Sequence, residues 1–260
     1  MTRRGGNLDK AEIGFSEPLF ESQERRSSEM KYARSTNQNP KCDLPEAKRI
    51  VIVDDHPLFR KGLEELINSE SSFAVCGEAG NAAQAMEVIR KLNPDLAIID
   101  LSLPGANGIE LIKNIRAEFA KLPVLVLSMH DESLYALRSL RAGAEGYVMK
   151  HEAMANVIHA IHEVFNGRPY LSPAMAAQVI TRVAHGADDQ ADPVDKLSDR
   201  ELEILELIGK GKEVRQIAKL LHLSPKTVET HRSHIKDKLD LKNSREVARF
   251  ALQWLNTRNA

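Results

Sequence analysis

From Lys48 onward, short apolar runs alternate with longer amphipathic stretches. Continuous apolar runs of four or so residues are typical of strands that are buried on both faces of a sheet. The runs are Ile50–Val53, Phe73–Val75, Leu96–Ile99, Val124–Leu127 and Tyr147–Met149. Apolar spacings of three and four predict helices over 57–68, 82–92, 108–119, 132–142 and 152–165. Five such repeats predict an α/β domain with a doubly wound, five-stranded parallel sheet and helices on both of its faces.

Beyond Leu197 the apolar pattern becomes purely helical. It predicts four helices, over 199–210, 214–221, 225–239 and 244–255. Ser198 and Ser224 stand where N-caps are expected, and Pro225 stands at a first helical position, where its missing N–H has no cost. The chain therefore carries a second, smaller domain of the all-α class.

The rest of the chain predicts an extension and a linker. Residues 1–47 are polar and have no sustained apolar period, so we expect a disordered N-terminal extension, or else a translation start later in the gene, as at Met30. Residues 166–195 are rich in Pro, Gly and Asp and predict a linker with one short helix near 174–184. The predicted domains are then 48–165 and 196–260.

Composition and charge narrow the class of protein. The 260 residues are 42% hydrophobic and 28% charged, which is typical of a soluble globular protein. No apolar run approaches the roughly 18 residues of a membrane span, and the N-terminus has no signal-peptide pattern, so we expect a cytoplasmic protein that does not contact a membrane. The two cysteines lack Cys or His neighbours at metal-ligand spacing, which argues against a disulfide framework or a zinc site.

The net charge of −1 hides an asymmetry between the two predicted domains. Residues 48–165 carry 12 basic and 16 acidic side chains, whereas residues 196–260 carry 14 basic and 9 acidic ones. A basic C-terminal domain favours a polyanionic partner, and the acidic domain before it does not.

Polar residues follow four of the five predicted strands, at the edge where open parallel sheets bind ligands. They are Asp54, Asp55, Asp100, Ser128 and Lys150. Three converging carboxylates would raise one another's pKa unless a cation offset them, so a hard, oxygen-liganded ion such as Mg²⁺ is the natural occupant. The alternative is that each Asp only caps the helix that follows it.

The stretches VIVDDHPLFR, LAIIDLSLPGANGIELI, VLVLSMHDE and AGAEGYVMK together resemble the receiver domain of two-component response regulators, which has a flavodoxin-like fold. The resemblance covers residues 48–165 almost from end to end. It implies that Asp100 accepts a phosphoryl group from a histidine kinase. It also implies that Asp55, Asp100 and the backbone carbonyl of Ser102 hold Mg²⁺, that Asp54 assists, and that Lys150 contacts the phosphate.

The same resemblance assigns a switch to Ser128 and Tyr147. In the family the hydroxyl turns toward the new phosphate and the aromatic ring moves inward behind it. A phosphoryl group adds about −1.5 to −2 charge and strong acceptor oxygens, which would bias these two arrangements. One departure is His151 after Lys150, where many receivers have proline, so the cis peptide of those relatives is not expected here.

The stretch LSDRELEILELIGKGKEVRQIAKLLHLSPKTVETHRSHIKDKLDLKNSREVARFAL resembles the LuxR-type, or GerE-like, helix-turn-helix. Together with the receiver it places the chain near the NarL/FixJ group. The resemblance implies a recognition helix over 225–239 that enters the major groove. It places on or near DNA the residues Lys226, Thr227, Glu229, Thr230, His231, Ser233 and His234, with Lys236 beside the backbone.

Val228 and Ile235 should point into the core of this domain. Two positions depart from the family pattern. At the start of the helix predicted over 214–221, the family usually has Ser/Thr-Asn-Lys, and this chain has Glu213-Val214-Arg215 instead. This change would alter a phosphate contact. Asp240 stands where a helix-ending glycine is common, which would strain the turn between the last two helices. A helical bundle whose basic face is only solvated is the alternative to DNA binding.

The leading hypothesis is a transcription regulator whose promoter binding, or homodimerisation, increases on phosphorylation. It is not an enzyme, apart from intrinsic autophosphorylation and autodephosphorylation of the receiver. A metal-dependent phosphatase with an aspartyl-phosphate is a rival, but such enzymes carry a second Asp two residues after the nucleophile, where this chain has Ser102. A degenerate receiver that only binds proteins is a third possibility, against which the intact Asp55, Asp100, Ser128 and Lys150 argue.

Overall fold

The computed structural model describes residues 47–185 and 193–258. The predicted extension therefore lies, except for Ala47, outside the described residues. The first domain is built on a sheet of strands β1 (Lys48–Val53), β2 (Phe73–Ala79), β3 (Leu96–Ile99), β6 (Val124–Ser128) and β7 (Gly146–Met149). Its order is β2-β1-β3-β6-β7, and every pairing is parallel. The predicted doubly wound sheet is confirmed.

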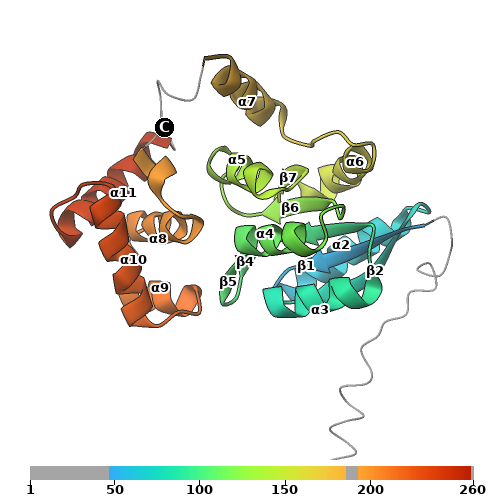
Figure 1. The fold of residues 1–260 in the computed structure, drawn as a ribbon, viewed down its shortest axis with the longest axis horizontal. Helices are drawn as coiled ribbons and strands as arrows, with labels where there is room; N and C mark the ends of the chain where they lie inside the picture. The colour runs from blue at the N-terminus through green and yellow to red at the C-terminus, as the bar shows by residue number, and fades with distance from the viewer. Residues whose placement is uncertain (1–46, 186–192, 259–260) are drawn as a thin grey trace, which may run out of the picture. The chain divides into compact units, whose positions relative to one another are not determined.

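Helices cover both faces of this sheet (Figure 1). Helices α2 (Pro57–Ser69) and α6 (Ala153–Phe165) pack on one face, and α3 (Ala82–Leu92), α4 (Gly108–Glu118) and α5 (Glu132–Ala142) cover the other. Because strand side chains alternate between faces, Ile50 and Ile52 join the first core and Val51 and Val53 join the second. Burial on both sides explains the continuous apolar runs.

Two features of the sheet differ from the predicted pattern. Strand β2 continues beyond Val75 to Ala79, and a register shift between Ile50 and Val51 keeps it paired with β1. Gly77 and Glu78 interrupt the apolar run there, so periodicity stopped too early. Strands β4 (Ser102–Leu103) and β5 (Ala106–Asn107) form a small antiparallel ribbon after β3. Two-residue strands are too short to produce a sequence period.

The predicted linker contains more regular structure than expected. Helix α7 (Pro173–His185) extends the short helix predicted near 174–184, and a 3₁₀ turn, η2 (Pro193–Lys196), precedes the last domain. Residues 186–192 lie outside the described part of the chain. Tyr170 forms an isolated bridge with Gly146, so the first part of this segment adds to the edge of the sheet beside β7.

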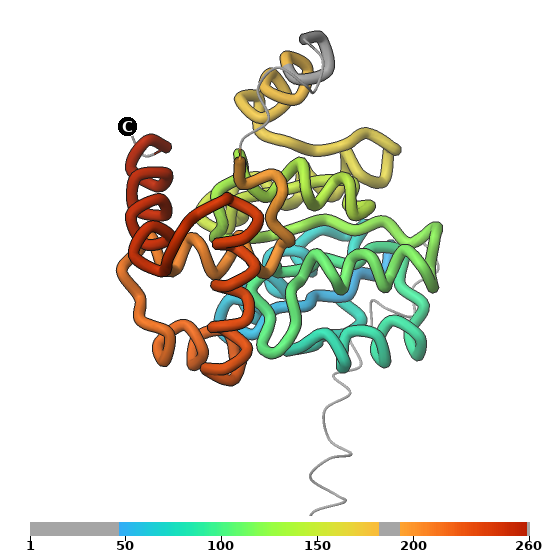
Figure 2. The backbone as a smooth tube through the Cα atoms, turned by 60° about the vertical axis from the view of Figure 1, so that its left-hand side comes forward, coloured from blue at the N-terminus to red at the C-terminus, as the bar shows by residue number. Residues whose placement is uncertain are grey.

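The C-terminal domain consists of α8 (Asp199–Gly209), α9 (Val214–Leu220), α10 (Pro225–Lys238) and α11 (Ser244–Arg258). Helix α8 packs against both α10 and α11, and α9 packs against α10, an arrangement that can be followed in the orange and red part of Figure 2. The Ser224 hydroxyl accepts a hydrogen bond from the Thr227 amide at 3.0 Å, as predicted for an N-cap. Val228 and Ile235 are fully buried, which confirms their predicted direction.

Asp240 adopts the left-handed backbone conformation, with a φ of 52°. The sequence predicted strain at this position because a glycine is common there. A non-glycine residue in this region costs roughly 1–2 kcal/mol, although Asp and Asn bear it better than most. The turn between α10 and α11 therefore stores the predicted strain without disrupting either helix.

None of the helices in the described ranges has the length and apolar character that a membrane span requires.

Candidate functional site

The carboxyl ends of β1 and β3 meet at the point where the strand order reverses, which is where doubly wound sheets bind ligands. Asp54 follows β1 and Asp100 follows β3, and each is only 2% exposed. The ammonium of Lys150, after β7, lies 2.6 Å from Asp54 Oδ2 and 2.8 Å from Asp100 Oδ2. The fold thus brings together the charged residues that the strand-end pattern selected.

The backbone fixes the two buried carboxylates. Asp54 Oδ1 accepts a hydrogen bond from the His56 amide at 2.8 Å, and Asp100 Oδ1 accepts one from the Ser102 amide at 3.2 Å. Gly108, the first residue of α4, lies against the backbone of Asp100. A side chain would not fit there, since a Cβ would lie 2.5 Å from the Asp100 carbonyl oxygen. Neither aspartate is the N-cap of α2 or α4, whose caps are His56 and Asn107. The simple helix-capping alternative is therefore insufficient.

The donors in this pocket fit a hard divalent cation. Asp54, Asp55, Asp100 and His56 each place one ligand atom within 4.8 Å of the others. Asp55 Oδ1 is buried and lies 2.6 Å from His56 Nδ1 without the alignment of a hydrogen bond. Carboxylate oxygens gathered in this way are the ligands that Mg²⁺ prefers.

Burial and the neighbouring charges shift the pKa values of Asp100 and Lys150. Burial raises the pKa of the Asp100 carboxyl, against the attraction of Lys150, and the nearby Asp54 raises it further. Burial disfavours the Lys150 ammonium, but the carboxylates of Asp100 and Asp54 outweigh it and raise the pKa of Lys150. Lys150 is therefore a firmly charged cation in this pocket, and a bound divalent ion would balance the remaining carboxylates.

Ser128 and Tyr147, the proposed switch pair, are both fully buried. They lie on neighbouring strands and meet through the backbone of His130. The Tyr147 hydroxyl donates to the His130 carbonyl at 2.8 Å, and the Ser128 hydroxyl accepts from the His130 amide at 3.1 Å. Burial raises the pKa of the Tyr147 phenol, so the ring stays a neutral donor. The Tyr147 side chain is therefore buried, with its hydroxyl hydrogen-bonded to the backbone after β6.

Sequence reasoning missed two histidines that border the pocket. His56 contacts the carboxylates of Asp54 and Asp55, and the ring of His130 lies 3.0 Å from the Ser102 hydroxyl through Nε2. Their positions in the sequence could have indicated them, since His56 directly follows the Asp pair and His130 comes two residues after Ser128. Neither histidine directly follows a predicted strand, so the strand-end pattern does not include it.

His130 also reaches a buried glutamate of the C-terminal domain. Its Nδ1 lies 3.4 Å from Glu206 Oε2 in α8, and the same oxygen accepts a hydrogen bond from the Tyr135 hydroxyl at 2.7 Å. Burial raises the pKa of Glu206, but the bonds from His130 and Tyr135 outweigh it and lower it overall. Lys113 and Arg138 add ion pairs to Asp199 at the start of α8. A polar path therefore connects Ser102 to α8.

Helix α10 carries the residues that the sequence predicts for DNA contact, and they differ in exposure. Five of them are exposed: Lys226, Glu229, Thr230, Ser233 and His234. The other three, Thr227, His231 and Lys236, are half-buried. The Thr230 hydroxyl donates to the Lys226 carbonyl at 3.1 Å, which leaves its lone pairs free to accept. Glu229 pairs with Arg232 at 3.0 Å, so its charge is partly offset.

Comparisons with known proteins agree with this architecture. Residues 50–162 match the family model described as the response regulator receiver domain, and residues 195–251 match the one described as bacterial regulatory proteins, luxR family. The chain is 36% identical over 210 residues to the oxygen regulatory protein NreC of Staphylococcus carnosus. That alignment covers 79% of this chain and 97% of the relative.

Two solved structures are similar as well. A LuxR-family two-component response regulator from Aurantimonas sp. SI85-9A1 is 37% identical, with a TM-score of 0.50 over 53% of this chain and 99% of that one. RcsB from Salmonella enterica serovar Typhimurium, bound to a promoter with a phosphomimetic, is 27% identical, with a TM-score of 0.54. That match covers 78% of this chain and 98% of RcsB.

Proposed function

The chain belongs to the NarL-type two-component response regulators, which join a receiver to a LuxR-type helix-turn-helix, and we propose that phosphorylation of Asp100 controls its DNA binding. It is a DNA-binding transcription regulator rather than a classical enzyme. The observation that carries the proposal is the ammonium of Lys150, held between the buried carboxylates of Asp54 and Asp100 at the switch point of the sheet. We assign the receiver to 48–165 and the DNA-binding domain to 196–260.

In this proposal a carboxylate oxygen of Asp100 attacks the phosphorus of a phosphohistidine on a histidine kinase. The P–N bond breaks, and the histidine leaves with the electron pair and takes up a proton. Asp54, Asp55, Asp100 and the carbonyl of Ser102 would hold Mg²⁺, which when bound supplies positive charge that offsets the charge on the phosphoryl oxygens. Lys150 lies in hydrogen-bond reach of Asp100 and would pair with the new phosphate.

The switch would then pass through the residues around His130. The hydroxyl of Ser128 accepts from the His130 amide, so turning it toward a phosphate on Asp100 would release that bond. His130 is in turn next to Glu206 of α8. We propose that this rearrangement loosens the contact between the receiver and α8, and that the freed protein binds promoter DNA as a homodimer in the cytoplasm. Intrinsic dephosphorylation would reset it.

Lys150→Ala tests this function. We expect partial labelling by acetyl phosphate but no phosphorylation-dependent gain in DNA affinity, because Lys150 contacts the phosphate rather than performing the attack. DNA binding is measured with and without phosphodonor in Mg²⁺, alongside labelling and a thermal melt, since Asp54 and Asp100 lose a buried partner. The exposed Lys91→Ala is the matched control. Equal activation of Lys150→Ala and wild type would remove Lys150 from the switch.

Tyr135→Phe tests the coupling to α8. The change removes one hydroxyl from a buried side chain and keeps its ring, so Glu206 loses its 2.7 Å donor. A hydrogen bond to a charged group contributes about 1.5–3 kcal/mol, so we expect unphosphorylated Tyr135→Phe to bind DNA at least about tenfold more tightly than wild type. Its phosphorylated affinity should not change.

Tyr170→Phe, at a half-buried tyrosine of the linker, is the control for this variant. Binding is measured by fluorescence anisotropy of a labelled promoter duplex without phosphodonor. A basal affinity of Tyr135→Phe equal to that of wild type would show that the contact with Glu206 does not restrain DNA binding.

A further inference from the structure

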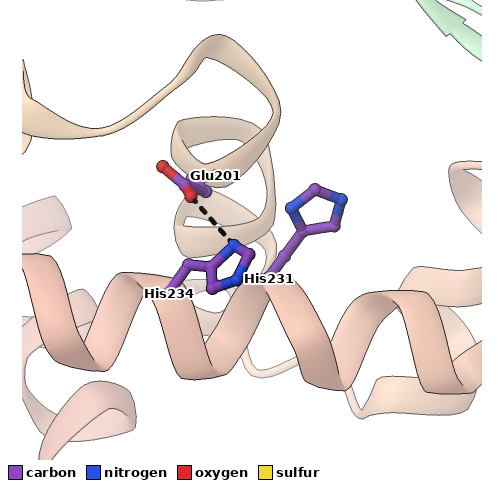
Figure 3. A group of neighbouring side chains, drawn as sticks. All are labelled: Glu201, His231 and His234. Carbon is purple, nitrogen blue, oxygen red and sulfur yellow. Dashed lines mark ion pairs between the residues drawn. The ribbon is translucent and has the colours of Figure 1, made fainter.

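Outside the acidic pocket, the helix-turn-helix domain contains a second group of metal-binding side chains. Glu201 of α8 and His231 and His234 of α10 each place one possible ligand atom within 4.8 Å of the others. Figure 3 shows both imidazoles on the side of α10 that faces α8, with His234 directed at the Glu201 carboxylate. The spacing of three residues places the two histidines on one face of the helix.

We propose that Glu201, His231 and His234 form a site for a divalent transition metal, with Zn²⁺ as the best match. Two imidazole nitrogens and one carboxylate are a donor set that Zn²⁺ favours and that Mg²⁺ does not. His234 has a side chain that is 55% exposed, so solvent can reach this edge and water would take the fourth position.

Glu201 is held in place by partners that leave one oxygen for the metal. Its Oε2 accepts hydrogen bonds from the Ser198 amide at 2.7 Å and from the Lys238 ammonium at 2.6 Å. Its Oε1 lies 3.6 Å from His234 Nδ1, which is beyond a direct hydrogen bond. Hydrogen-bond donors to the other oxygen of a ligating carboxylate orient that carboxylate, and their loss weakens metal binding. Ser198 and Lys238 would do this here.

His231 has an unused nitrogen at the same place. Its Nδ1 is buried and has no hydrogen-bond partner among the described residues. A buried imidazole nitrogen without a partner is costly, and a metal ion would satisfy it. Burial lowers the pKa of His231, and the nearby Arg200 and His234 also lower it, although Glu201 opposes them.

Closing the site needs only small side-chain rotations. Metal–ligand bonds of about 2.0–2.2 Å separate tetrahedral ligand atoms by roughly 3.3–3.6 Å. One pair of atoms is already at 3.6 Å, and the others lie within 4.8 Å. Both remaining pairs include His231, so a rotation of this half-buried ring toward Glu201 and His234 would close the site. Because Lys238 and Arg200 add positive charge nearby, we expect micromolar rather than nanomolar affinity.

The experiment titrates full-length protein with Zn²⁺ by calorimetry and with Co²⁺ by visible absorption, in millimolar Mg²⁺ that occupies the acidic pocket. We expect one equivalent with a micromolar Kd and the absorption of a four-coordinate Co²⁺ ion. Saturating Zn²⁺ should also raise the unfolding midpoint by about 5 °C, because the metal connects α8 to α10 in the folded state only.

His234→Gln should weaken binding at least tenfold and remove the Co²⁺ spectrum. This residue is exposed, so the variant is expected to fold. His222→Asn is the control, because it removes an exposed imidazole of the same domain at a left-handed position that Asn tolerates. Wild-type affinity in His234→Gln would overturn the assignment. So would binding that persists in His234→Gln and disappears in Asp55→Ala, which would place the metal in the receiver.

Discussion

Asp100→Asn is expected to abolish labelling by a small phosphodonor such as acetyl phosphate in the presence of Mg²⁺. An amide oxygen is not a nucleophile toward phosphorus, and an amide is a poorer ligand than a carboxylate for a hard cation. The substitution keeps the shape of a side chain that is 2% exposed. The amide oxygen can still accept the bond from Lys150, so loss of folding is not the expected cause.

Asp131→Asn provides the control, because Asp131 caps α5 and Asn caps helices equally well. It should be labelled like wild type. Asp55→Ala should also lose labelling, since Asp55 contributes a ligand atom to the acidic group. Full labelling of Asp100→Asn would move the acceptor to another residue, whereas normal Mg²⁺ binding by Asp55→Ala would show that the proposed ligand set is wrong.

The sheet could be predicted because its strands are buried on both faces. Val51 and Val53 face one core while Ile50 and Ile52 face the other, which leaves an apolar run with no polar interruption. The site followed from topology, since the ends of β1 and β3 must meet in a parallel sheet. Strand β4 and the last residues of β2 could not be predicted, because tertiary pairing rather than a local pattern stabilises them.

Residues that contact one another across large sequence separations were beyond the reach of the sequence. Glu206 and Tyr135 are 71 positions apart, and nothing in the helical period of α8 distinguishes a buried glutamate from a solvated one. The prediction that a zinc site is unlikely has the same limit, because it considered only neighbours in the sequence. The spacing around the cysteines argued against a site, but Glu201 approaches His231 and His234 only because α8 packs on α10. Asp240, by contrast, could be predicted because its strain is local.

Thr230→Ala and Lys236→Ala are expected to affect DNA binding in different ways. Base-edge contacts discriminate between sequences, while phosphate contacts supply affinity without sequence information. Thr230 is exposed on α10 and has acceptor lone pairs available, so its loss should cost roughly 1–3 kcal/mol on the cognate site only. Lys236 lies farther along the helix, and its loss should weaken binding to cognate and random duplexes alike.

Loss of a phosphate contact should also flatten the slope of log affinity against log salt by about 0.9, for Lys236→Ala and for Lys226→Ala. Thr257→Ala is the matched control for Thr230, because Thr257 in α11 makes the same bond to the carbonyl four residues earlier. Binding is measured against salt on cognate and scrambled duplexes, and a homodimer should leave a twofold-symmetric footprint. If Thr230→Ala and Lys236→Ala lose the same affinity on both DNAs, α10 does not present Thr230 to the base edges.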